Sequence, residues 1–123
     1  MIGMGVAAAL SAQYAQEQRE FLPMIARVLK DSMPNEVELL ESGLFKKTLR
    51  GVVVNQGDNR LALEDPGRGA LQATFTRIVR GIALKTERLT VEEWLVMVGD
   101  VLEHAAQENA AARRSLAKTL GLD

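Results

Sequence analysis

The sequence predicts an α+β fold: an N-terminal helical segment, an antiparallel meander of four to five strands and a long C-terminal helix. Three observations support this prediction. Apolar residues recur every three or four positions near both ends of the chain, which is typical of amphipathic helices. Short alternating segments separated by turn residues fill the middle. The chain has 123 residues, so we expect a single domain over residues 1–123.

The first helical segment is predicted over residues 4–32, where apolar side chains recur at helical spacing. Pro23 interrupts this pattern, because proline removes a backbone hydrogen bond and clashes with the preceding turn. We therefore expect a kink or a break near Glu20 to Leu22, so the segment is one bent helix or two short ones. Pro34 ends it, since the residue before a proline avoids the helical region.

The central strands are predicted from side-chain alternation and turn chemistry. They cover residues 49–54, 60–64 and 71–75, after a weaker segment at 37–40, with turns at 56–59 and 65–69. Connections this short make the strands antiparallel. After Phe75 the apolar residues change from odd to even numbers, which predicts a bulge or bend between Arg77 and Gly81, or a new strand.

The longest pattern runs from Leu89 to Gly121 and predicts one long helix. Thr90 and Glu93 have the spacing of a capping box at its start. Gly121 is suited to a glycine cap at its end.

A heptad seam runs along this helix and contains Asn109, Ala112 and Leu116. One interpretation is a self-pairing helix in which Asn109 fixes the register. The other is a helix end that extends beyond a small core and leaves Asn109 in contact with water. The seam residues are therefore candidates for an interface between two copies.

Composition excludes several classes of protein. The formal net charge is −1 and aromatic residues make up 4% of the chain, so the basic and aromatic character of many nucleic-acid binders is missing. The chain has no cysteine, which excludes disulfides and thiolate chemistry. No apolar run is long enough to span a bilayer. Without a basic region before the first apolar stretch, the expected location is cytoplasmic.

Residues for catalysis or cofactor binding are few. His104 is the only histidine, so no ordinary zinc site can form. No glycine-rich nucleotide motif follows a strand, and no serine lies in a strand–turn–helix elbow. We therefore expect no enzymatic activity, no cofactor and no metal.

Two surface clusters are candidates for binding. The first is basic: Arg77, Arg80, Lys85 and Arg88 lie within one short stretch. They form a phosphate or nucleic-acid patch, or they pair with the acids of the long helix. The second cluster is Leu44 and Phe45, which fold back onto the core or act as an exposed anchor for a partner protein.

One resemblance concerns most of the chain. Its segments are residues 22–29, Met33-Pro34, Gly43-Leu44-Phe45, residues 79–86 and residues 92–95. Together they resemble a group of small uncharacterised bacterial proteins, often actinobacterial, over residues 14–120. The resemblance implies no activity and no site residue. It implies that the domain stands alone as a gene product.

The functional expectation is a non-enzymatic protein–protein interaction module, an adaptor, scaffold or chaperone-like binder. An open sheet edge and a helical seam both favour self-association, so we expect a homodimer with a further protein partner whose identity the sequence does not give. The alternative is a small dimeric nucleic-acid-associated protein that uses the basic cluster.

Overall fold

The computed structural model describes residues 3–120, and its element order confirms the predicted α+β class. The elements are, in chain order, α1 (Gly3–Gln16), α2 (Gln18–Ser32), β1 (Val37–Ser42), β2 (Thr48–Gln56), β3 (Asn59–Glu64), β4 (Gln72–Val79), β5 (Ile82–Leu89), α3 (Val91–Glu108) and α4 (Ala110–Leu120).

The strands form one antiparallel sheet in the order β1-β2-β3-β4-β5. The shift from odd to even apolar positions has two causes. Arg80 and Gly81 both have positive φ, 52° and 80°, as a two-residue hairpin turn requires, and so β5 begins after them. The register of β4 on β5 also shifts between Arg77 and Ile78. The predicted bulge and the predicted new strand are therefore both present.

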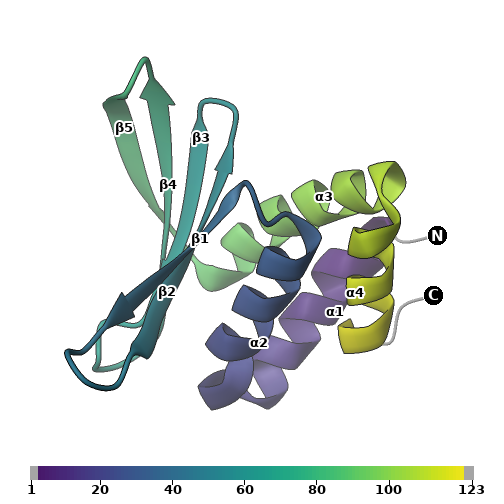
Figure 1. Ribbon diagram of the computed structural model, residues 1–123, viewed down its shortest axis with the longest axis horizontal. Helices are drawn as coiled ribbons and strands as arrows, with labels where there is room; N and C mark the ends of the chain where they lie inside the picture. The colour runs from purple at the N-terminus through teal and green to yellow at the C-terminus, as the bar shows by residue number, and fades with distance from the viewer. Residues whose placement is uncertain (1–2, 121–123) are drawn as a thin grey trace.

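The helices lie on one face of this sheet (Figure 1). Helices α2 and α3 contact the strands, while α1 packs mainly against α3 and α4 mainly against α2. Val52, Val54, Leu61 and Leu63 point into the core that the helices cover. At Gly99 a Cβ atom would lie 3.1 Å from the backbone of Ala7, so glycine allows α1 and α3 to approach closely.

The N-terminal segment is broken, but not where the sequence predicted. Helix α1 ends with a hydrogen bond from Glu17 N to Gln13 O, and the Glu17 side chain then accepts from Arg19 N at 3.2 Å. Pro23 lies inside α2. The predicted break near Glu20 to Leu22 is wrong, because a new helix starts at Gln18 and includes Pro23.

The C-terminal segment consists of two helices, so the prediction of one long helix is wrong. Asn109 has extended backbone angles, φ −146° and ψ 147°, and its side-chain oxygen accepts a hydrogen bond from Ala112 N at 2.7 Å. Asn109 thus caps α4. The capping box of Thr90 and Glu93 is confirmed. The predicted glycine cap at Gly121 lies outside the described residues.

Candidate interaction surface

The sheet face opposite the helices is not covered by any element within residues 3–120 (Figure 1). Alternation from the buried Ala73 places Thr74 and Thr76 on this open face. Their partners on β5 are Arg88 and Thr86. Antiparallel sheets commonly keep one solvated face of this kind. Its β4–β5 part is polar, whereas Ala62 and Val53, which are in register with Thr74, are buried on it.

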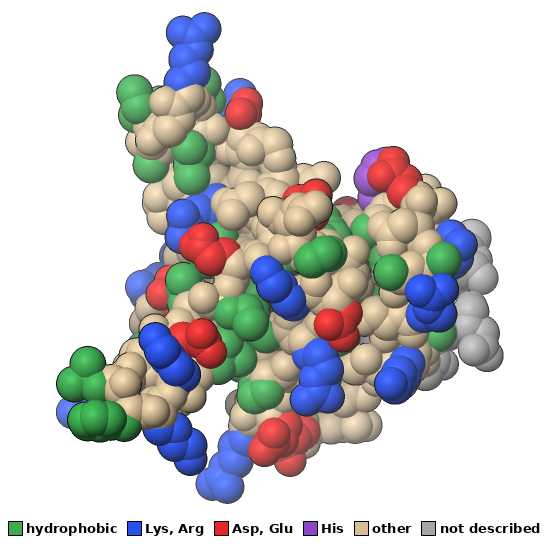
Figure 2. Space-filling model, in the orientation of Figure 1, with side chains coloured by type: hydrophobic (Ala, Val, Ile, Leu, Met, Phe, Trp, Pro, Cys, Tyr) green, Lys and Arg blue, Asp and Glu red, His purple; other side chains and the backbone are tan. Residues whose placement is uncertain are grey.

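Strand β5 is the edge of the sheet next to this face. It has β4 on one side and no described strand on the other, so its outer N–H and C=O groups are available for pairing. Ile82 and Leu84 are 63% and 61% exposed. The β4–β5 hairpin extends past the helices at the upper left of Figure 1, and Figure 2 shows apolar side chains beside basic ones at its tip.

Strand β5 also carries an ordered pair of charges. Lys85 Nζ lies 2.9 Å from Glu87 Oε1, because residues two apart on a strand share a face. This hydrogen bond and the negative charge of Glu87 raise the pKa of Lys85 above its ordinary value of 10.5. The Lys85 side chain is 72% exposed and that of Glu87 is 46% exposed, so water screens their attraction and the pair alone adds little stability.

The predicted basic cluster is exposed but divided. Arg77 lies opposite Lys85, Arg88 lies on the open face, and Arg80 lies in the hairpin turn. Among residues 3–120 the contacts between basic and acidic side chains are the Lys85–Glu87 ion pair and the contact of the His104 ring with the Glu108 carboxylate. The predicted pairing of the basic side chains with acids of the C-terminal helix is therefore wrong. Arg77 and Lys85 share one face of the sheet, Arg88 lies on the other face and Arg80 lies at the turn.

The loop between β1 and β2 carries a second exposed apolar group. Leu44 is 93% exposed and Phe45 is fully exposed, so neither residue folds back onto the core. Gly43 has φ +114°, a conformation that favours glycine and turns the chain sharply. This loop lies at the lower left of Figure 1, where Figure 2 shows apolar and basic side chains together.

The helical seam does not form an exposed apolar face, although Asn109 itself is exposed. Ala112 and Leu116 are buried in the core that α4 shares with the rest of the chain, and Asn109 caps a helix. The predicted self-pairing seam is therefore used within one chain, and these three residues do not form an exposed face.

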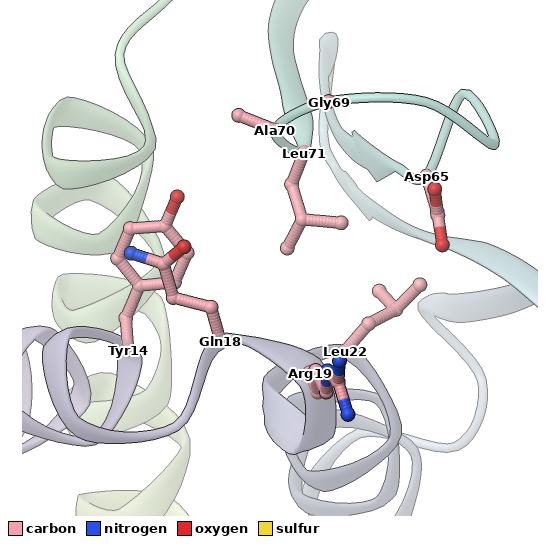
Figure 3. Close-up of a pocket in the computed structure, with 8 residues that line it drawn as sticks. All are labelled: Tyr14, Gln18, Arg19, Leu22, Asp65, Gly69, Ala70 and Leu71. Carbon is pink, nitrogen blue, oxygen red and sulfur yellow. The ribbon is translucent and has the colours of Figure 1, made fainter.

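A cavity of about 330 Å³ lies between the helices and the loop before β4. Figure 3 shows Tyr14, Gln18 and Arg19 on its helical side, with Gly69, Ala70 and Leu71 on the facing loop. Burial, and to a lesser degree the negative charge of Glu92, raise the pKa of Tyr14. The lining supplies a guanidinium, a phenol and the Asp65 carboxylate, but no nucleophile with an adjacent base.

A second cavity of about 250 Å³ brings together Ser32, His104 and Glu108. His104 Nε2 lies 3.2 Å from Glu108 Oε1. Sequence reasoning missed this group because Ser32 and His104 are far apart in the chain. The Ser32 hydroxyl is buried and has no hydrogen-bond partner, so no substrate can reach it as a nucleophile. The three residues therefore do not form a catalytic triad.

Comparison with known proteins gives no relative from which a function could be transferred. No family model, curated protein or solved structure matches the chain. Within residues 3–120 no helix is long and apolar enough to cross a membrane. In the same part of the chain, no cluster of three or more His, Cys, Asp or Glu residues could hold a metal ion.

Proposed function

We propose that this protein is a non-enzymatic interaction module that self-associates through the free edge of β5. The observation that carries the proposal is the exposure of Ile82 and Leu84 on a strand with one neighbour. Another strand could satisfy the outer backbone groups of β5, and contact with it would remove part of the exposed apolar surface of β5 from water. An adaptor, scaffold or chaperone-like role in the cytoplasm fits such a surface.

The opposite edge of the sheet, β1, is less available for pairing. Lys30 Nζ donates hydrogen bonds to the carbonyl oxygens of Pro34 and Val37, at 3.1 and 3.0 Å, so a helix side chain already covers the start of this edge. Glu38 and Glu41 add two like charges along it, whereas β5 carries charges of both signs. These contacts favour β5 over β1 as the pairing edge.

Light scattering tests the proposal through the solution mass of the chain. The mass should rise toward that of a dimer as concentration increases. Leu84→Lys should shift the chain toward monomer, because it places a charge in the proposed contact. Val96→Lys makes a similar change at an exposed residue of α3 and should leave the dimer intact. A chain that stays monomeric at high micromolar concentration would contradict self-association.

The loop between β1 and β2 is the competing contact region. Leu44 and Phe45 are more exposed than any apolar residue of β5. If Leu44→Lys abolishes the dimer and Leu84→Lys does not, the contact lies at this loop and β5 is not the interface.

A second candidate is the nucleic-acid-associated dimer. It is supported by the exposure of Arg77, Arg80, Lys85 and Arg88, none of which pairs with a helix acid in the described structure. Their different directions and the net charge of −1 weigh against it. Binding to a labelled duplex should then fall steeply with salt through counterion release, and Arg80→Ala should weaken it. Binding without salt dependence would exclude this candidate.

A further inference from the structure

We infer that the partner of β5 is a second copy of this chain, paired antiparallel with β5 about a two-fold axis at Thr86. The inference rests on the proposed self-association and adds its register. Three features of β5 carry it: the symmetry of an antiparallel pair, the order of the charges on the strand, and the position of its irregularity.

Symmetry limits the possible registers. Residues of an antiparallel ladder lie directly opposite one another, and a two-fold contact is self-complementary. When a strand pairs with its own copy, the axis therefore passes between a residue and the same residue of the copy. With Thr86 on the axis, Lys85 lies opposite Glu87 of the second copy, and Glu87 lies opposite Lys85 of that copy.

The charges favour this register over its neighbours. Lys85 and Glu87 already lie 2.9 Å apart on one face of the strand. The pairing about Thr86 brings together Lys85 and Glu87 of both copies. Each of these four charges then lies beside an opposite charge on its own strand and opposite another across the interface. An axis at Lys85 or at Glu87 would instead place like charges directly opposite each other, which is destabilising.

The other face of β5 also accommodates the axis. Thr86 lies on the open face, with its hydroxyl 3.1 Å from that of Thr76, and threonine pairs across strands are favourable. The register of β5 on β4 is regular from Lys85 to Leu89, and the irregularity lies nearer the hairpin turn. The axis residue therefore belongs to the regular part of the strand.

The pairing joins two five-stranded sheets into one continuous sheet. Because the axis is perpendicular to the sheet, the helices of both copies lie on one face and the two open faces become continuous. Both copies use the same edge in this contact, so two copies complete the assembly and no β5 edge remains free. Pairing of β5 with β1 of another copy would be heterologous and would leave a free edge at each end, so it would grow into a filament.

Complementary charge variants test the register. In Lys85→Glu a glutamate faces Glu87 of the second copy, and in Glu87→Lys a lysine faces Lys85. Each variant alone should raise the dimer dissociation constant about tenfold, because both symmetric pairs become repulsive. An equimolar mixture should recover the dimer as a heterodimer, since one copy is then acidic at both positions and the other basic. The double variant Lys85→Glu/Glu87→Lys should dimerise like the original chain.

These outcomes separate the register from the proposed function. Both side chains are exposed, so circular dichroism should show an unchanged fold in every variant. If both single variants dimerise like the original chain, or if their mixture does not recover the dimer, the register is wrong although self-association stands. A monomeric original chain would overturn both, and growth into filaments would overturn the closed contact.

Cross-linking gives an independent measurement, because the chain has no cysteine of its own. Thr86→Cys should form a disulfide-linked dimer under mild oxidation, since directly opposite Cα atoms lie about 4.5–5.5 Å apart, within disulfide range. Arg88→Cys is the matched control on the same strand. Its two copies would lie about 14 Å apart, four residues along the ladder and one strand across, and should not cross-link. Cross-linking of Arg88→Cys in preference to Thr86→Cys would overturn the register.

Discussion

The centre of the sheet and the β4–β5 hairpin are built from similar sequences but have opposite environments. Leu63 of β3 is buried under the helices, whereas Leu84 of β5 is mostly in solvent. Both lie on strands and both follow an alternating apolar pattern. The difference arises because α2 and α3 cover the middle of the sheet and the hairpin extends beyond them (Figure 1). Alternation thus specifies a strand, but its burial depends on the layer packed against it.

The two regions are also held together differently. The centre is stabilised by burial of apolar surface. The hairpin is stabilised by its positive-φ turn at Arg80 and Gly81, by the contact of the Thr76 and Thr86 hydroxyls and by the Lys85–Glu87 pair. Polar contacts in solvent contribute little each, so side chains stabilise the hairpin less than they stabilise the centre of the sheet. The following predictions test this contrast, from the largest expected effect to the smallest.

The largest contrast is between two truncations of leucine. Leu63→Ala should lower the free energy of unfolding by about 2–5 kcal/mol, because it removes buried methyl groups and leaves a cavity. Leu84→Ala should change it by less than about 0.5 kcal/mol, as at other surface sites. Chemical denaturation at a concentration where the chain is monomeric measures both. Equal losses would show that the hairpin is packed like the core.

A smaller loss in the free energy of unfolding is expected when Gly51, on β2, is replaced. A Cβ atom there would lie 2.8 Å from the carbonyl oxygen of Leu63, which is backbone and cannot turn away. Gly51→Ala should therefore destabilise the chain by about 1–3 kcal/mol through overpacking. Gly57→Ala is the control in an open turn, where nothing lies within 4 Å of the added atom, and any loss there reflects its positive φ alone.

Loss of the Asn109 cap at the junction of α3 and α4 should lower the free energy of unfolding by about 1 kcal/mol. Asn109→Ala removes the oxygen that accepts from Ala112 N, and loss of such a cap typically costs about 0.5–2 kcal/mol. Asn109→Asp keeps the acceptor and should retain most of the stability. The solution mass should be the same for all three proteins. A change in oligomeric state on Asn109→Ala would instead show that the C-terminal helices form the interface.

The smallest effect concerns two groups whose pKa values are raised for opposite reasons. Burial disfavours the charged phenolate of Tyr14, whereas Glu87 favours the charged ammonium of Lys85. Tyr14 is the only tyrosine, so phenolate absorbance should report a midpoint above 10.0. The unfolded phenol ionises first, so stability should fall as pH rises above 10.0. Glu92→Gln should lower the midpoint slightly, and a midpoint at or below 10.0 would contradict the burial of Tyr14.

The sequence predicted the strands well, because turns and alternation are local signals. It placed the kink or break of the first helical segment near Glu20 to Leu22 because of Pro23, whereas the break lies at Glu17, which caps α2. It placed Ala112 and Leu116 on a seam because helical spacing shows which residues share a face, not which neighbour covers it. The sequence does contain an indication that β5 is exposed. Lys85, Glu87 and Arg88 put charges on both faces of this strand, which is typical of an edge strand.

By itself, the sequence determined the fold class, the order of the elements, the antiparallel connections and the cap of α3, because each depends on residues a few positions apart. The tertiary structure alone decided that α4 packs on α2 and that the helices cover the centre of the sheet but not the hairpin. Packing of this kind joins residues distant in the chain, and no local pattern specifies which of several apolar faces it will bury. The surface proposed for self-association is the apolar edge that this packing left uncovered.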